Sequence, residues 1–177
     1  MNKKPQILKS ETIARSRFFE IETVDIRFSN GVEAHWERLV SRGHGAVLIV
    51  AIDDDDKLLL IREYAAGTER YELAFPKGKM EAGEDPAQSA LREMKEEIGY
   101  GAHDIRLMKT VSLAPGYFNH HTHLMLARDL YPEKLEGDEP EPLELVRWPI
   151  ADVDALLARD DFTEARSMAA LFLALSR

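Results

Sequence analysis

The chain has 177 residues, of which 45% are hydrophobic and 31% charged, and a formal net charge of −9. This length and composition predict one compact domain with a sizeable core rather than a disordered chain, and the acidic balance disfavours binding to nucleic acid polymers. Without cysteine, and without an apolar segment long enough for a signal peptide or a membrane span, the sequence predicts a soluble cytoplasmic protein with no membrane partner.

The first part of the chain shows the alternation typical of antiparallel strands. β-rich segments lie on both sides of Asn30-Gly31, and Asn-Gly in this context predicts a two-residue hairpin turn. We expect residues 1–44 to form an N-terminal β arm and residues 45–177 to form the main domain.

Two short apolar segments, Ala46–Ile52 and Lys57–Ile61, indicate buried strands of a central sheet. Four aspartates, Asp53–Asp56, separate them. A metal site is one interpretation of these aspartates, but successive side chains diverge in a turn, so we assign them to a solvated turn without a functional role.

The segment Asp85–Ile98 carries the clearest helix signals. Asp85 is a good N-cap, Pro86 suits the first helical position, Gln88 completes a capping box and Gly99 can end the helix. Apolar residues recur on one stripe, which we expect to face the core: Ala87, Ala90, Leu91, Met94 and Ile98.

The remaining elements alternate strands with short helices. We predict strands over Ile105–Leu113 and Thr122–Leu130 and around Val146–Trp148, an acidic loop over Glu133–Pro142, and helices over Asp152–Ala158 and Glu164–Leu175. This order of elements predicts an α/β fold, a sandwich of helices around one mixed sheet.

Three glutamates on the predicted Asp85–Ile98 helix carry the chemistry. Glu93, Glu96 and Glu97 have the spacing i, i+3 and i+4, which places their carboxylates on one side, where like charges repel. A hard divalent cation such as Mg²⁺ would relieve this repulsion. The alternative is a solvated acidic face that Arg92 and Lys95 partly neutralise.

The segment from Gly78 to Tyr100 resembles the Nudix box. Its specified residues are Gly78, Glu84, Arg92, Glu93, Met94, Glu96, Glu97 and Gly99. Eight matches at fixed spacing are specific. The one departure is Tyr100, which stands where the motif has an aliphatic residue.

This resemblance implies a Nudix fold and hydrolysis of a nucleoside diphosphate linked to another group, with Mg²⁺ as cofactor and Mn²⁺ able to replace it. It implies that Glu93 and Glu97 are the main metal ligands and that Glu96 is a further ligand or orients water. The backbone carbonyl of Gly78 is implied as another ligand.

The resemblance also implies that Arg92 and Glu84 form an ion pair that positions the catalytic helix. A bound metal would neutralise the diphosphate and lower the pKa of the attacking water.

Other segments resemble the ADP-ribose pyrophosphatase branch of the Nudix superfamily, and most of the chain resembles its bacterial ADP compounds hydrolases. The segments include Leu60–Tyr64, Tyr71–Leu73 and Ala114–Tyr117. This implies small-molecule substrates, namely ADP-ribose, NADH and diadenosine polyphosphates such as the triphosphate, with release of AMP.

The same branch implies a homodimer in which the N-terminal arm takes part. Trp36 is then a candidate for stacking on a base, Arg38 for binding ribose or phosphate, and Arg62 for reaching the diphosphate. Packing of Trp36 in a core or interface and surface ion pairs of the two arginines are the alternatives.

The acidic loop around residues 136–141 corresponds to the place where this branch supplies a mobile carboxylate as base or metal ligand. Glu139 and Glu141 are the candidates, and the sequence does not select between them. A merely solvated loop is the alternative.

Three nearby histidines, His120, His121 and His123, do not indicate a zinc site, because alternate residues of a strand face opposite sides. Two other functions stay open beside hydrolysis of ADP-containing compounds. One is a dedicated diadenosine polyphosphate hydrolase, which Phe75–Gly78 also resembles, and the other is a noncatalytic nucleotide sensor, which the intact glutamates disfavour.

Overall fold

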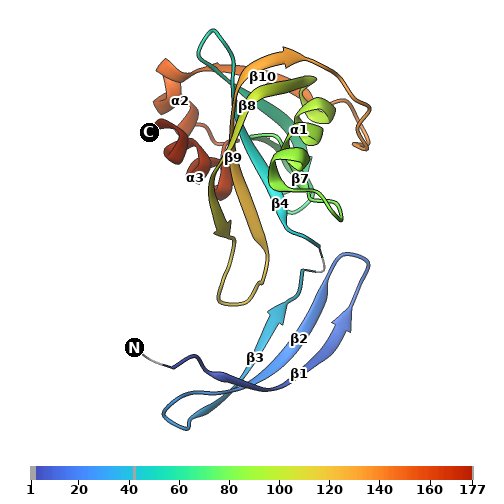
Figure 1. Cartoon of the computed structure of the whole chain (residues 1–177), viewed down its shortest axis with the longest axis vertical. Coiled ribbons are helices and arrows are strands. Elements are labelled where there is room, and N and C mark those ends of the chain that lie inside the picture. Colours follow the sequence, from blue (N-terminus) through green and yellow to red (C-terminus); the bar gives the residue numbers. More distant parts are fainter. Residues whose placement is uncertain (1–2, 42, 177) are drawn as a thin grey trace. The chain divides into compact units, whose positions relative to one another are not determined.

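The structure is a computed structural model that describes residues 3–41 and 43–176. The chain forms two compact units, one of residues 1–42 and 112–121 and the other of residues 43–111 and 122–177. Figure 1 shows the elements of both units along the chain. The boundary expected after residue 44 stays a prediction, and the first unit also includes a segment from the middle of the chain, residues 112–121.

The first unit contains a three-stranded antiparallel sheet of β1 (Gln6–Arg15), β2 (Glu20–Arg27) and β3 (Glu33–Leu39), with β2 in the middle. The predicted antiparallel arm is confirmed. The turn differs from the two-residue prediction, because Phe28 N donates to Val32 O at 2.8 Å and three residues lie between them. Gly31, with φ of 83°, supplies the left-handed residue that such three-residue hairpins require.

The second unit is built on a seven-stranded mixed sheet. Its strands are β4 (Ala46–Ile52), β5 (Lys57–Ala65), β6 (Arg70–Ala74), β7 (Lys77–Lys79), β8 (Tyr100–Ser112), β9 (His121–Pro132) and β10 (Glu144–Pro149). The main order is β10-β5-β4-β9-β8, with β6 paired to β5 and β7 to β4. Strand β4 runs parallel to β9 and antiparallel to β5 and β7.

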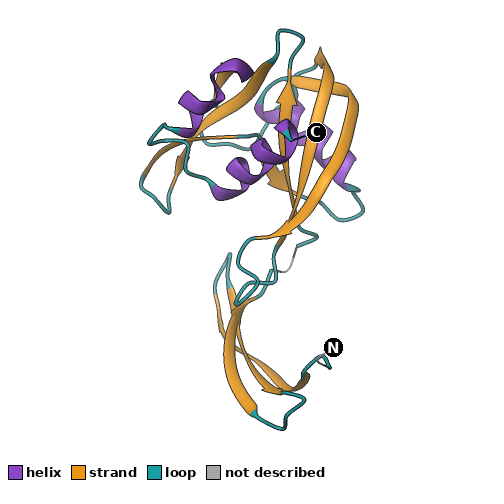
Figure 2. Ribbon diagram, turned by 90° about the vertical axis from the view of Figure 1, so that its left-hand side faces the viewer, coloured by secondary structure: helices purple, strands orange, loops and turns teal. Residues whose placement is uncertain are grey.

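Helices cover both faces of this sheet, as Figures 1 and 2 show. The helix α1 (Pro86–Glu97) covers one face, and α2 (Val153–Leu157) and α3 (Ala165–Leu175) cover the other, with a 3₁₀ turn at Ile150–Asp152 before α2. All seven residues of β4 are buried, and those from Val47 to Ile52 alternate between the two cores. The predicted α/β/α sandwich is therefore confirmed.

Two local features explain departures from the sequence patterns. Tyr100 begins β8, and its hydroxyl accepts a hydrogen bond from Arg147 at 2.6 Å, so the aromatic residue has a partner that an aliphatic one would lack. In the aspartate turn, Asp53 Oδ1 accepts from the backbone N–H groups of Asp55 and Lys57 at 3.1 and 2.9 Å. Asp53 thus stabilises the β4–β5 turn rather than lying free in solvent.

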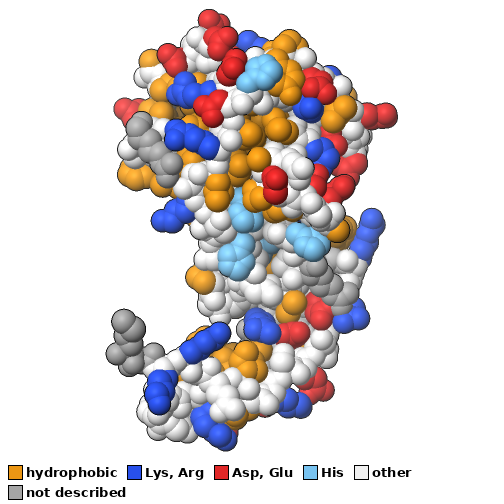
Figure 3. Space-filling model, viewed as in Figure 1, with side chains coloured by type: hydrophobic (Ala, Val, Ile, Leu, Met, Phe, Trp, Pro, Cys, Tyr) orange, Lys and Arg blue, Asp and Glu red, His pale blue; other side chains and the backbone are white. Residues whose placement is uncertain are grey.

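The surface of the second unit carries charges of both signs, interspersed with hydrophobic side chains on the face that Figure 3 shows. None of the helices that the described residues form is both long and apolar enough to cross a membrane.

Candidate active site

The helix α1, which carries the three glutamates, is capped as the sequence predicts. Asp85 Oδ1 accepts hydrogen bonds from the backbone N–H groups of Ala87 and Gln88 at 2.8 and 2.9 Å, and Gln88 Oε1 accepts one from Asp85 N at 3.0 Å. Gly99, with φ of 76°, ends the helix. These two caps, together with the buried apolar stripe, fix the direction in which the carboxylates point.

Arg92 is the centre of the ion-pair network on α1. Its guanidinium donates to both carboxylate oxygens of Glu84 at 2.8 and 3.1 Å, and to the Lys79 carbonyl at 3.0 Å. It also donates to Glu93 Oε1 at 2.8 Å and Glu96 Oε2 at 2.9 Å. The hydrogen bonds from Arg92 lower the pKa of Glu84 to about 2. Arg92 therefore joins the preceding loop to the helix.

Glu93 packs directly against Gly78. A Cβ atom placed on Gly78 would lie 1.9 to 2.1 Å from the carboxylate atoms of Glu93, so any larger residue would displace that carboxylate. Glu93 is buried, and burial raises its pKa against the opposing effect of Arg92. Gly78 thus provides the space in which a buried carboxylate is held.

Glu97 is the most strongly perturbed carboxyl group of the box. It is buried, its Oε2 accepts a hydrogen bond from the backbone N–H of Lys77 at 2.8 Å, and burial raises its pKa to about 8. The neighbouring Glu93 adds to this shift. Lys77 Nζ pairs with Glu63 Oε2 at 2.6 Å.

The Lys77–Glu63 pair was not predicted from the sequence. Lys77 immediately precedes Gly78 of the box, which is the only local signal for it, and Glu63 lies on β5, 14 residues away. No spacing rule connects residues of two different strands, β5 and β7, that are not paired with each other.

Among the residues that the structure describes, no three His, Cys, Asp or Glu side chains converge as a metal site. The box carboxylates instead bind Arg92 and the Lys77 backbone. Their chemistry nevertheless suits a hard cation, because two buried carboxyl groups, Glu93 and Glu97, have raised pKa values and a nearby divalent charge would stabilise their ionised forms.

The acidic loop gives its two candidate residues different surroundings. Glu141 is exposed and accepts a hydrogen bond from the Tyr71 hydroxyl at 2.7 Å. Glu139 is half-buried, and its charge contributes to raising the pKa of Glu93. The structure thus brings Glu139 toward the box, whereas Glu141 is held by Tyr71, to which the sequence analysis gave no role of its own.

Arg62 forms ion pairs with two carboxylates. Its guanidinium donates to Asp161 Oδ2 at 2.6 Å and to Glu144 Oε2 at 3.1 Å. Arg159 has the larger effect in lowering the pKa of Asp161, and the contact with Arg62 adds to it. A role for Arg62 at a diphosphate stays a prediction that would require these ion pairs to rearrange.

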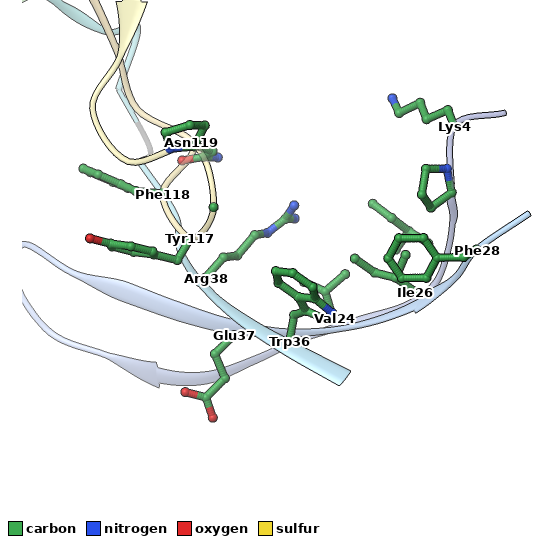
Figure 4. Close-up of a pocket in the computed structure, with 14 residues that line it drawn as sticks. Lys4, Val24, Ile26, Phe28, Trp36, Glu37, Arg38, Tyr117, Phe118 and Asn119 are labelled. Atoms are coloured by element: carbon green, nitrogen blue, oxygen red, sulfur yellow. The ribbon is translucent and has the colours of Figure 1, made fainter. Parts of the chain in front are cut away.

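Trp36 and Arg38 belong to the first unit, where they project from β3 into a groove of about 380 Å³ (Figure 4). Trp36 is 48% exposed and lies beside Val24, its partner on β2. Arg38 donates to Glu22 Oε2 at 2.8 Å. The groove offers an exposed indole and a guanidinium, which are the two groups proposed from the sequence for base and phosphate.

Two of the three histidines contact different partners. The His120 ring stacks on Phe118 with centroids 5.3 Å apart, and His123 Nδ1 lies 2.9 Å from Thr110 Oγ1. The interpretation that the histidines do not form a zinc site stays a prediction from the sequence.

Comparison with known proteins identifies both parts of the chain. Residues 42–172 match the NUDIX domain, and residues 5–38 match the NudE-type Nudix hydrolase N-terminal domain. The chain is 55% identical to the ADP compounds hydrolase NudE of Escherichia coli, over 96% of this chain and 91% of that protein. It is 29% identical to the ADP-ribose pyrophosphatase of Bacillus subtilis, over 93% and 91% of the two chains.

A solved structure, the crystal structure of an ADP compounds hydrolase, has the same fold. It superposes with a TM-score of 0.91 at 53% sequence identity, over 98% of this chain and 94% of that chain. Together with the box geometry on α1, these matches show that the chain is an enzyme and belongs to the Nudix hydrolase family.

Proposed function

We propose that the protein hydrolyses the diphosphate linkage of ADP-containing compounds and releases AMP. Water adds across the P–O–P anhydride, one P–O bond breaks, and ADP-ribose would yield AMP and ribose 5-phosphate. The observation that carries the proposal is the set of glutamates on α1: Arg92 and the space at Gly78 hold Glu93, Arg92 also holds Glu96, and the Lys77 N–H holds Glu97. The names of the similar proteins from E. coli and B. subtilis support the substrate class.

The family generally uses divalent cations, and we propose Mg²⁺, with Mn²⁺ as a substitute. Glu93 and Glu97 would hold it, with Glu96 and the Gly78 carbonyl as further ligands. When bound, such a cation neutralises the diphosphate and activates water for attack. Arg92 keeps the carboxylates in place through its contacts with Glu84 and the loop, so it acts as a positioning residue.

Of the two loop carboxylates, we propose Glu139 as the base that takes a proton from the attacking water. Its partial burial and its electrostatic effect on Glu93 support a place near the box. Glu141 is already engaged by Tyr71. A base must come within hydrogen-bond reach of the proton that it removes, which favours the carboxylate nearer to the box glutamates.

We propose that the N-terminal arm binds the adenosine part of the substrate. Trp36 would stack on adenine and Arg38 would bind ribose or phosphate, in a homodimer to which the arm of each subunit contributes. The exposed groove around these side chains supports this assignment. Arg62 is a further candidate for the diphosphate. The cytoplasmic location and the lack of a nucleic acid partner stay predictions from the sequence.

The decisive test is AMP formation by the purified protein with ADP-ribose, NADH and diadenosine triphosphate, with and without Mg²⁺. Comparable, Mg²⁺-dependent turnover of all three supports the proposal. Glu97→Gln should lower kcat about 10²- to 10³-fold. Asp54→Asn, in the exposed β4–β5 turn, serves as the matched control and should retain activity.

The alternatives give different product patterns. Turnover of diadenosine compounds alone would indicate a dedicated diadenosine polyphosphate hydrolase. Binding of these nucleotides without any turnover would indicate a noncatalytic sensor, and the proposal would then be wrong.

A further inference from the structure

The loop between β9 and β10, residues 133–143, contacts other elements of the second unit near both of its ends. At its start, Leu135 N donates to Lys95 O at 3.0 Å, and Lys95 Nζ pairs with Glu133 at 2.9 Å. At its far end, the Tyr71 hydroxyl donates to Glu141 Oε1 at 2.7 Å. The first anchor fastens the loop to α1, and the second fastens it to β6.

The second anchor comes from a strand rather than from the helix that carries the box. Tyr71 lies on β6 opposite Tyr64 of β5, and the two rings meet edge to face with centroids 5.5 Å apart. Both rings are about half exposed, at 47% and 50%. Packing against Tyr64 limits the movement of the Tyr71 ring, so the hydroxyl is presented to the loop in one direction.

The Tyr71–Glu141 hydrogen bond has a charged acceptor, which makes it stronger than a bond between neutral groups. The neighbouring carboxylate of Glu141 raises the pKa of Tyr71, so the hydroxyl keeps its proton and remains a donor at neutral and mildly alkaline pH.

Glu139 lies between the two anchors and close to the second. It is two residues from Glu141, and two residues of chain span at most about 7 Å, so fixing Glu141 confines Glu139 to a small region. The Glu139 carboxylate lies close to the backbone of Gly137, because a Cβ atom there would be 2.2 Å from Glu139 Oε2. The electrostatic effect of Glu139 on Glu93 agrees with a location toward the box.

We propose that Tyr71 is a positioning residue of this hydrolase: by holding Glu141, its hydroxyl fixes the end of the 133–143 loop and keeps Glu139 directed toward the glutamates of α1. The proposal rests on the proposed function, because it assumes that Glu139 acts on the substrate water. It gives the two loop glutamates separate tasks, with Glu141 as the anchor and Glu139 as the reacting group.

The test uses the full-length enzyme with Tyr71→Phe, which removes one oxygen and keeps the ring. We expect kcat for ADP-ribose to fall about fivefold to tenfold, the loss that one hydrogen bond to a charged group can produce, while KM changes less than about twofold. Tyr64→Phe removes the same atom from the neighbouring ring and should leave kcat within about twofold of wild type.

Two further measurements separate positioning from a general structural defect. Glu141→Ala should reduce kcat as much as Tyr71→Phe, and the double variant should be no slower than either, because both remove the same contact. Amide hydrogen exchange of residues 136–142 should accelerate in Tyr71→Phe and not in Tyr64→Phe, with exchange in β4 and β5 unchanged.

The outcomes distinguish this proposal from the proposed function. A wild-type enzyme that does not hydrolyse ADP-ribose or the other compounds overturns the proposed function and, with it, the role of Tyr71. An active wild type whose Tyr71→Phe variant keeps normal kcat, or normal exchange in the loop, overturns the role of Tyr71 alone.

Discussion

The two units of the chain bury their strands very differently. Every residue of β4 in the second unit is buried, whereas every residue of β1 in the first unit is exposed. Of the strand residues in the first unit, only Glu20 and Val24 are buried. The second unit buries its apolar side chains between its own sheet and helices. The three-stranded sheet of the first unit buries so little surface that it gains little stability by itself.

This contrast has a functional side. The positions and pKa values of the box glutamates depend on burial and on close contacts within the second unit. The catalytic rate should therefore respond to the change of a single atom in this unit. The first unit presents exposed apolar and aromatic side chains, which suit contact with a ligand or with a second copy of the chain.

The largest expected effect follows from Glu97→Gln. This change prevents ionisation of a buried carboxyl group, which a bound divalent cation would favour, while leaving the shape and the acceptor for the Lys77 N–H. We expect kcat for ADP-ribose to fall about 10²- to 10³-fold, as when one electrostatic group of an active site is removed. A steady-state assay measures this, and a decrease of less than about tenfold would mean that Glu97 is not a main ligand.

Gly78→Ala should have the next largest effect. The added methyl group would overlap the Glu93 carboxylate, and a displacement of about 1 Å can cost about 100-fold in rate. Gly67→Ala is the control, because a Cβ atom there has no neighbour within 4 Å. Equal kcat values for the two variants would show that the position of the Glu93 carboxylate does not limit the reaction.

Local spacing explains why this part of the site could be predicted and other parts could not. Arg92, Glu93, Glu96 and Glu97 lie within six residues on one helix, so the helical period alone places them together. The Tyr71–Glu141 contact joins residues 70 positions apart, and only the folded sheet brings them together. The same holds for the ion pairs of Arg62.

In the fold, too, elements with a strong local pattern could be predicted and the others could not. Strands β4 and β9 and the helix α1 were predicted because their apolar patterns are strong, whereas the short strands β6 and β7 carry no repeating pattern and were missed. The hairpin turn at Asn30-Gly31 was expected with two residues and has three, because the strand pairing ends at Phe28 and Val32.

A smaller effect should follow from a charge placed on the arm. Ile7 is 52% exposed and lines the groove of the first unit, and Leu107 on β8 of the second unit is 47% exposed. If the arm forms the dimer, Ile7→Lys should weaken dimerisation about tenfold to a hundredfold, because an unpaired charge would be buried at the interface. Leu107→Lys should not. Sedimentation of both variants measures this, and equal dimer populations would show that the groove is not an interface.

The smallest effect concerns the Glu84–Arg92 ion pair and stability in acid. The pKa of Glu84 is about 2 in the folded protein and has an ordinary value of 4.5, so the pair stabilises the fold fully above pH 4.5. That contribution is lost as the pH falls from 4.5 toward 2, because the carboxylate becomes protonated. Allowing for solvent screening, we expect it to be about 1–2 kcal/mol.

Glu84→Gln isolates this contribution from other carboxyl groups, which titrate in both proteins. The difference in free energy of unfolding between wild type and Glu84→Gln should be largest near pH 6 and should shrink as the pH falls from 4.5 toward 2. Denaturant titrations at a series of pH values measure it. A difference that stays constant with pH would mean that Glu84 supports the loop through its shape and neutral hydrogen bonds rather than through its charge, and that Arg92 is held mainly by Glu93 and Glu96.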